Sequence, residues 1–362
     1  MPSEDPLTAP SAPTAFVTGA TGLLGHNLVR ALLTQGHHVM ALSRSAAKAQ
    51  RQFAGLPVQH VIGDMADVQA FAHHLRGVDV LYHAAAYFRD SYKGGSHRDA
   101  LMATNVHATR ALMQAAHAQG VRRMVHVSSI AVLDGLPGQP IDETMSRDVR
   151  RADDYYLSKI LAEEEVRTFL ATHPDFWAAF VLPGWMHGPG DAGPTSAGQT
   201  VLDFLQRKLP AVPPGTFSIV DARDVAQAAI AVARQGRRGE RYLAAGRHTT
   251  MREFMTLLHD VTGVQPPRRN MPLPMLHVVA WLSELAGRLS GRPVLLSAAT
   301  VRLIARELDR THFDHRKSEA ELGVRWRPLV DTLRDEVAWL QAHVLAPQPA
   351  SDSPQRRTMA PR

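Results

Sequence analysis

The sequence predicts an α/β fold with a doubly wound parallel sheet and a smaller, mostly helical C-terminal lobe. Two observations predict it. From Thr14 onward, short apolar strands alternate with stretches of helical periodicity, a pattern that implies right-handed crossovers and a parallel sheet covered on both faces. A glycine-rich turn then follows the first strand directly, where such sheets bind ligands.

The first half of the chain supplies most of the predicted sheet. Its six expected strands are Ala15–Thr18, Val39–Leu42, Val58–Ile62, Val78–His83, Met124–Ser128 and Trp177–Leu182. The helix after the first strand shows Leu24, Leu28 and Leu32 on one face and ends at Gly36. Two longer helices are expected, one ending near Gly120 and one over Tyr155–Thr172.

The rhythm breaks after Pro183. A Gly/Pro/Ser-rich stretch is followed by a helix over Asp221–Arg234 and a strand over Arg241–Ala244, and the chain is then mostly helical from Met251 to His343. We therefore expect a Rossmann domain over 14–186 with returning elements around 217–246. We assign 187–216 and 247–345 to a substrate lobe, and 1–13 and 346–362 to a disordered leader and tail.

Composition excludes several classes of protein. The 362 residues include no cysteine, which excludes disulfide frameworks, zinc–thiolate sites and a cysteine nucleophile and fits a reducing, cytoplasmic location. No apolar run is long enough for a transmembrane segment, and the N-terminus lacks the features of a signal peptide. The formal net charge of +6 is spread without basic blocks, so we expect a small anionic partner rather than nucleic acid. The 19 histidines lack metal-ligand spacing, so no metal is expected.

The segment Thr18–Gly25 predicts a dinucleotide site. Gly19 permits a tight turn, Gly22 lets the backbone approach a pyrophosphate, and Gly25 lets the helix pack on the strand. The helix N-terminus offers N–H groups and a positive dipole end to the anion. The remaining expected cofactor contacts in this segment are Thr21, Leu23 and Leu24.

The end of the second predicted strand bears on the choice of cofactor. Where an acidic residue usually binds the ribose 2′-OH, this chain has Ser43 and Arg44, and a guanidinium there can bind a 2′-phosphate. NADP is therefore favoured and NAD stays possible. Asp64 and Met65, after the third strand, are expected to border the adenine.

A proton-transfer site is predicted from Tyr155 and Lys159, which lie at i and i+4 on one helix face. A free tyrosine with a pKa near ~10 is a poor base at neutral pH. A lysine ammonium ~4 Å away is worth roughly 4 kcal/mol at an effective dielectric of 20, or about three pKa units. Ser128 and Ser129 end the fifth strand, at the ligand-binding edge of the sheet.

From about Thr14 to His343 the chain resembles the extended short-chain dehydrogenase/reductase family, also described as the NAD-dependent epimerase/dehydratase family. The segments that carry the resemblance are Thr18–Gly25, His83–Ala86, Thr104–Val106, Val127–Ser129, Tyr155–Lys159, Leu182–Gly184, Gly188–Asp191 and Val220–Ala226.

The resemblance implies roles for individual residues. Tyr155 would be the acid/base, Lys159 would bind the nicotinamide ribose and lower the tyrosine pKa, and Ser129 would orient the substrate, with Ser128 as the next choice. Asn105 would support the site. Further cofactor contacts would come from Ala84, Ala85, Ala86, Ser128 and Pro183. Many members form dimers through two long helices beside the sheet, so a homodimer is possible.

Within the family, Gly239–Leu243 and the segment from Phe313 to Gly323 are most similar to dihydroflavonol 4-reductase-like reductases and to the related sugar-epimerase-like bacterial proteins. Two departures matter. No Asp-Glu pair follows the serines, which disfavours a dehydratase, and Pro183–Trp185 replaces the Asn-containing stretch of nucleotide-sugar epimerases.

We therefore expect an NADP-preferring oxidoreductase that acts on a carbonyl or alcohol of a moderately hydrophobic molecule. The aromatic and apolar residues that suggest this substrate are Tyr87, Phe88, Trp185 and Met186. Its alternatives are a sugar epimerase and a non-catalytic regulator that senses the dinucleotide. Substrate contact by His83 and His187, and membrane contact by the apolar stripe Leu276, Val279, Leu282, Leu285 and Leu289, are weaker alternatives to core packing.

Overall fold

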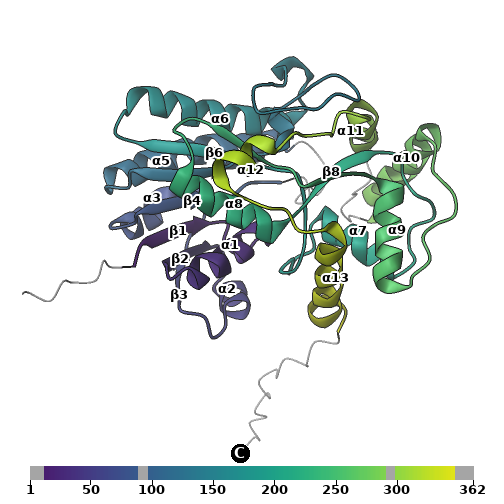
Figure 1. Cartoon of the computed structure of the whole chain (residues 1–362), viewed down its shortest axis with the longest axis horizontal. Coiled ribbons are helices and arrows are strands. Elements are labelled where there is room, and N and C mark those ends of the chain that lie inside the picture. The colour runs from purple at the N-terminus through teal and green to yellow at the C-terminus, as the bar shows by residue number, and fades with distance from the viewer. Residues whose placement is uncertain (1–11, 89–96, 291–297, 347–362) are drawn as a thin grey trace, which may run out of the picture.

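A computed structural model describes residues 12–88, 97–290 and 298–346 of the chain (Figure 1). Its main sheet has seven parallel strands in the order β3-β2-β1-β4-β5-β6-β9. These strands are β1 (Thr14–Thr18), β2 (His38–Ser43), β3 (Val58–Ile62), β4 (Val80–His83), β5 (Arg123–Val127), β6 (Trp177–Pro183) and β9 (Arg241–Ala244). The predicted fold class, a doubly wound parallel sheet, is confirmed.

Helices cover both faces of this sheet, as Figure 1 shows. On one face α1 (Leu23–Thr34) and α8 (Ala222–Gln235) pack against each other and share an apolar core with β1, β5 and β6. On the other face lie α3 (Val68–Phe71), α5 (Ala108–Ala118) and α6 (Asp154–Thr172). The strands inside the sheet are buried on both faces and are short, mostly apolar runs, whereas the edge strand β3 is largely exposed.

The second lobe is built around a smaller sheet, in the order β10-β8-β7. Its strands are β7 (Trp185–His187), β8 (Thr216–Asp221) and β10 (Arg247–Thr250). The helices of this half are α7 (Ser196–Leu205), α9 (Met251–Thr262), α10 (Leu273–Ser290), α11 (Ala298–Glu307) and α13 (Leu329–Leu340). A further helix, α12 (Arg316–Leu322), returns to pack beside α8 and β9.

Several local elements differ from the prediction. Helix α2 (Ala46–Gln52) was not predicted, and Ser45 caps it by accepting a hydrogen bond from the N–H of Lys48. The first long helix is divided into α4 (Arg98–Leu101), a π-helical turn (Met102–His107) and α5. Short helical turns also occupy Ala72–Leu75, Ile130–Val132, Val149–Arg151 and Gln341–Leu345.

Within the described part of the chain, no helix has the length and apolar character needed to cross a bilayer. Most of the predicted leader and tail lies outside the described residues. The side chain of Leu289, the last residue of the predicted apolar stripe, also lies outside them.

Candidate active site

The glycine turn after β1 is shaped by close backbone contacts. Gly19 has a φ of +66°, and a Cβ there would lie 2.8 Å from the backbone of Ala85. A Cβ on Gly25 would lie 2.2 Å from the carbonyl oxygen of Gly19. Gly22 is the N-cap of α1 and offers no side chain to cap the first turn. An uncapped helix N-terminus behind a glycine turn fits the pyrophosphate of a dinucleotide.

Hydrogen bonds hold the segment after β4 against this turn. The Ala85 N–H donates to the Thr18 hydroxyl at 3.1 Å, so Ala84–Ala86 lie beside the glycine turn as the sequence suggested. The two ring nitrogens of His83 contact the hydroxyls of Thr18 and Thr109 at 2.8 and 2.9 Å. Burial lowers the pKa of His83 to about 3. His83 is therefore a neutral structural residue.

The burial of His83 and His187 argues against the substrate contact that the sequence suggested for them. His83 is 1% exposed and His187 is fully buried, and the Nδ1 of His187 lies 2.9 Å from a carboxylate oxygen of Glu336. The sequence suggested that both lie near the ligand-binding crevice, but it could not show that their side chains are buried.

Arg44 is exposed just after β2, as the 2′-phosphate hypothesis requires. Lys48, one helical turn further along α2, was missed. Burial lowers its pKa, Asp191 opposes that shift and Arg44 contributes to it. The two cations are therefore close enough to interact. At the end of β3 Asp64 is exposed, whereas the Met65 side chain is buried in the core, which leaves its backbone for any cofactor contact.

Tyr155 and Lys159 lie in the first turns of α6, whose N-cap Asp153 accepts a hydrogen bond from the N–H of Tyr156. Both side chains are nearly buried. The Lys159 ammonium donates to the carbonyl oxygen of Val127 at the end of β5, at 2.9 Å. Burial lowers the pKa of Lys159 to about 8, and the nearby Glu163 partly offsets that shift.

Glu163 is a second residue, after Lys48, that the sequence did not predict. It lies one turn beyond Lys159 on α6 and is 2% exposed. One carboxylate oxygen accepts a hydrogen bond from Ser128 at 2.5 Å, and the other accepts from Arg241 on β9 at 2.8 Å. The sequence offered one weak signal for this role: Glu163 is four residues after Lys159 and therefore lies on the same face of the helix. A run of three glutamates, however, reads as a solvated surface.

The two candidate serines differ in their burial and in their hydrogen-bond partners. The Ser128 side chain is buried and turned to Glu163 beneath the sheet edge. Ser129 is half-buried and lines the large cavity beside Tyr155. Its hydroxyl accepts the N–H of Ala131 at 3.1 Å, which caps the short turn that follows.

Asn105 lies in the π-helical turn and is 3% exposed. Its amide donates to the Ser158 hydroxyl at 2.9 Å and to the Tyr87 carbonyl at 3.0 Å, and its oxygen accepts the Tyr87 N–H at 2.7 Å. Ser158 in turn donates to the carbonyl oxygen of Tyr155 at 2.7 Å. Asn105 thus fixes the start of α6, which carries Tyr155. Pi-helical turns are frequent at functional sites.

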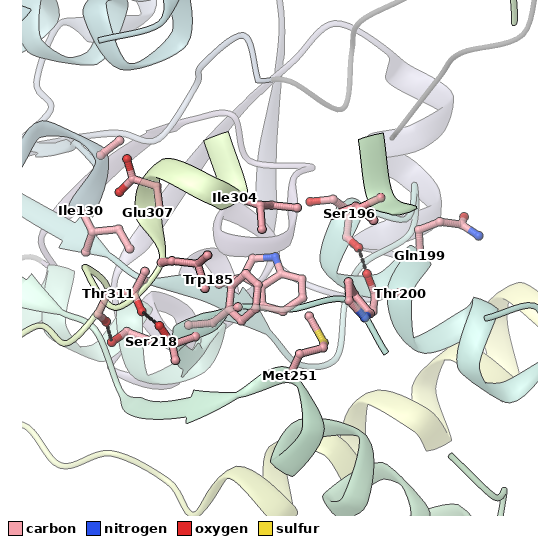
Figure 2. A pocket seen from close by; sticks show the side chains of 18 of the residues that line it. Ile130, Trp185, Ser196, Gln199, Thr200, Ser218, Met251, Ile304, Glu307 and Thr311 are labelled. Carbon is pink, nitrogen blue, oxygen red and sulfur yellow. Dashed lines mark hydrogen bonds between the residues drawn. The ribbon is translucent and has the colours of Figure 1, made fainter. Parts of the chain in front are cut away.

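A cavity of about 540 Å³ opens from Ser129 and Tyr155 into the second lobe. This volume suits a small organic ligand. Figure 2 shows Trp185, Met251 and Ile304 directed into it from three different elements. Its lining is largely apolar and includes Phe88, whose ring meets that of Tyr155 edge-on at 5.0 Å.

The buried arginine at this cavity is paired within the protein, whereas Asp203 of the lining accepts a hydrogen bond from the Gln199 amide at 2.8 Å. Arg147 is buried, donates to the carbonyl oxygens of Ala131 and Leu133, and pairs with Glu307 of α11 at 2.9 Å. Its guanidinium also lies 4.5 Å from the centre of the Tyr156 ring. Among the described residues lining the cavity, Arg147 is the sole basic side chain.

At the end of β6, Pro183 is buried and Gly184 is tightly enclosed. A Cβ on Gly184 would lie 2.6 Å from the carbonyl oxygen of Ser218 and 2.8 Å from that of Ala245. The main and small sheets therefore meet at this point, beside the cavity.

A glycine turn at the first strand and a Tyr–Lys pair beside a strand-end serine define the class: a Rossmann-fold protein of the NAD(P)-dependent type. The comparisons agree. Residues 15–245 match the NAD dependent epimerase/dehydratase family, and the chain belongs to this family of NAD(P)-dependent reductases, dehydrogenases and epimerases.

Two similar curated proteins span nearly the whole chain. A putative dihydroflavonol 4-reductase of Synechocystis is 32% identical over 91% of this chain and 94% of its own length. Sterol demethylase protein B of Methylococcus capsulatus is 34% identical over 91% of this chain and 98% of its own length. Among solved structures, gox2253 superimposes with a TM-score of 0.77 at 31% identity, over 91% of this chain and 98% of that one.

Proposed function

We propose that this protein is an NADP-preferring oxidoreductase that interconverts a carbonyl and an alcohol on a hydrophobic small molecule. The observation that carries the proposal is that Ser129 and Tyr155 both line one largely apolar cavity, with the Lys159 ammonium buried at the same edge of the sheet.

The roles follow from the position of each group. When bound, the nicotinamide would supply or accept the hydride. Tyr155 would give the proton to the carbonyl oxygen, and Ser129 would donate a hydrogen bond that orients this oxygen. Lys159 would hold a positive charge near the phenol and so favour its ionised form. Asn105 would act as a positioning residue through Ser158.

Two observations at the end of β2 support the preference for NADP: two cations lie there, and the acidic residue that usually binds the ribose 2′-OH is absent. Arg44 is exposed at the end of β2, and Lys48 lies one turn along α2. The residue before Arg44 is Ser43, whose hydroxyl donates to the carbonyl oxygen of Ser45. The end of β2 carries no carboxylate that could bind the 2′-OH of NAD. The two cations there favour the 2′-phosphate of NADP instead.

The cavity also favours a substrate without a diphosphate. Arg147 is the basic residue of its described lining and is already paired with Glu307. An incoming diphosphate would leave charge unpaired in an apolar site, which is costly. The names of the two relatives, a dihydroflavonol reductase and a sterol demethylase component, support a substrate with a large apolar frame.

The proposal is tested by following NADPH absorbance with a panel of steroid ketones, flavonoid ketones and long-chain ketones, alongside nucleotide sugars. We expect net NADPH consumption with at least one apolar ketone and a loss of roughly a hundredfold or more in kcat for Tyr155→Phe. The Kd for NADPH should change little in that variant, because the substitution removes a single hydroxyl.

The other outcomes point to the alternatives. Turnover of a sugar nucleotide with no net change in NADPH would mean an epimerase. NADPH binding without turnover of any substrate, together with a cellular phenotype that Tyr155→Phe leaves intact and Gly22→Asp abolishes, would mean a regulator.

A cytoplasmic location and a homodimer through α5 and α6 remain part of the proposal. Sedimentation equilibrium would test the dimer. Arg110 of α5 and Glu165 of α6 form an ion pair between these two helices, so substitutions there should weaken the proposed dimer.

A further inference from the structure

Helix α10 is apolar on two opposite faces. Leu276 and Ala280 are buried in the second lobe, and Leu276 and Val279 line the cavity. The opposite side, here called the outer face of α10, is exposed. Its residues are Met275 (54% exposed), Val278 (57%), Trp281 (61%), Leu282 (51%) and Leu285 (43%).

The predicted stripe thus turns out to be divided between these faces. Residues spaced by three drift around a helix of 3.6 residues per turn. Leu276 and Val279 therefore face the protein, whereas Leu282 and Leu285 face outward. Reading the stripe as core or lid packing is correct for the first pair and wrong for the second.

The outer face is large for an exposed apolar surface. Its five side chains present roughly 500 Å², the size of the functional patches found on monomeric proteins. A stable interface between two proteins buries about 800 Å² on each side. The outer face alone is therefore small for a dimer but sufficient for a helix lying in a lipid headgroup region.

Exposed cations come from the segment before α10 and from α11, the helix that packs against it. Arg268 and Arg269 are exposed on the segment that leads into α10, and Arg302 is exposed on α11, which packs against α10. For these three guanidiniums the described part of the chain shows no ion pair. Exposed arginines next to an apolar helix face complement an anionic membrane surface.

We propose that the outer face of α10 docks on the surface of an anionic lipid bilayer, with Trp281 at the headgroup level and the three arginines against lipid phosphates. Tryptophan is enriched at this depth of the membrane. Helix α10 lies at the opposite end of the molecule from α5 (Figure 1), so docking leaves the main sheet free.

The proposal goes beyond the proposed function but connects with it. The same helix supplies Leu276 and Val279 to the cavity wall and the outer face to the lipid. An apolar substrate dissolved in the bilayer would therefore lie one helix diameter from the cavity, and would not need to cross water.

Co-sedimentation of the full-length protein with vesicles tests docking without substrate or cofactor. We expect binding to phosphatidylglycerol vesicles, at least tenfold weaker binding to phosphatidylcholine vesicles, and weakening by salt. The double variant Trp281→Glu/Leu285→Glu should lose binding at least tenfold. The matched control is the double variant Leu136→Glu/Val149→Glu, which adds the same two negative charges at residues that are 70% and 49% exposed and should keep binding.

The proposal is overturned if the wild-type protein stays in the supernatant with both vesicles at low ionic strength. It is also overturned if sedimentation velocity shows a dimer that the double variant abolishes while vesicles bind neither protein, since the occupant would then be a second copy. Far-UV circular dichroism and NADPH binding of the double variant verify that it folds. Because vesicle binding needs no turnover, a failure here leaves the proposed reaction untouched.

Discussion

The two halves of the molecule build their binding surfaces from different parts of the chain. Beside β1 the surface is backbone: Gly19 and Gly25 fit against neighbouring peptide groups with no room for a Cβ. In the second lobe the cavity is lined by apolar side chains from several elements. Backbone surfaces allow little variation, while apolar side chains can be exchanged at modest cost. One half is therefore suited to a constant ligand and the other to a variable one.

Replacing a glycine of the turn should give the largest effect. A Cβ on Gly25 would lie 2.2 Å from the Gly19 oxygen, whereas a Cβ on Gly22 would lie 3.3 Å from the same atom. We expect Gly25→Ala to lower the free energy of unfolding by about 3 kcal/mol and Gly22→Ala by less than about 1 kcal/mol. Urea denaturation without cofactor measures both, and equal losses would contradict a backbone-defined turn.

Glu163→Gln should change the pH dependence of the reaction. Lys159 is charged below its pKa of about 8, which burial lowers and Glu163 partly restores. Reduction that depends on the ammonium should therefore decline above about pH 8. Removing the Glu163 charge lowers the Lys159 pKa further, so the decline should begin at lower pH.

The measurement is a profile of kcat against pH for both proteins. Glu164→Gln is the matched control, because Glu164 is the next residue on α6 and is exposed. An unchanged profile in Glu163→Gln would show that the network supports the fold alone. If Glu163→Asp restores the wild-type profile, the charge rather than the shape of the side chain is responsible.

Arg44→Asp should weaken NADPH binding roughly tenfold and leave NADH binding unchanged or improved, since the carboxylate repels a 2′-phosphate and accepts a 2′-OH. Lys48→Ala should act in the same direction by a smaller factor, because Lys48 is the more distant cation along α2. Fluorescence titration with both cofactors measures the ratio. Equal losses for NADPH and NADH would mean that neither cation contacts the 2′-phosphate.

The smallest effect is expected in the second lobe. Trp185 lines the cavity and contacts the rings of Phe217 and Phe254 at 5.0 and 5.7 Å. Trp185→Phe should alter KM for apolar ketones roughly threefold and leave kcat and NADPH binding nearly unchanged, because one apolar group replaces another. A loss of kcat as large as that of Tyr155→Phe would contradict the contrast between the two halves.

The parts of the fold that the sequence predicted are those with a local physical signal. The strands of the main sheet are short apolar runs, and Gly19 and Gly25 lie where a turn excludes a Cβ. The small sheet was missed because β8 pairs with β7 and β10 across long separations, and β7 directly follows β6 with one residue between them. Helix α2 was missed because the cap at Ser45 was not recognised.

The candidate site also contains some residues that a local sequence pattern predicts and others that no local pattern predicts. Tyr155, Lys159 and Ser129 follow motifs that can be read along the chain, although their roles stay predictions. Glu163 owes its importance to Ser128 and Arg241, which come from two other elements. No local pattern reveals that a glutamate within an acidic run is buried. The orientations of His83 and His187 were hidden for the same reason.

The π-helical turn at Met102–His107 has a consequence for how this chain tolerates changes in length. Such a turn contains one more residue than the α-helical turn it replaces. A one-residue deletion there would restore a regular α-helix and leave the faces of α4 and α5 nearly in place, because the π-helical turn absorbs the extra residue. The protein would keep its helix and its core while Asn105 lost its partners. A deletion that looks harmless in an alignment could thus separate folding from turnover.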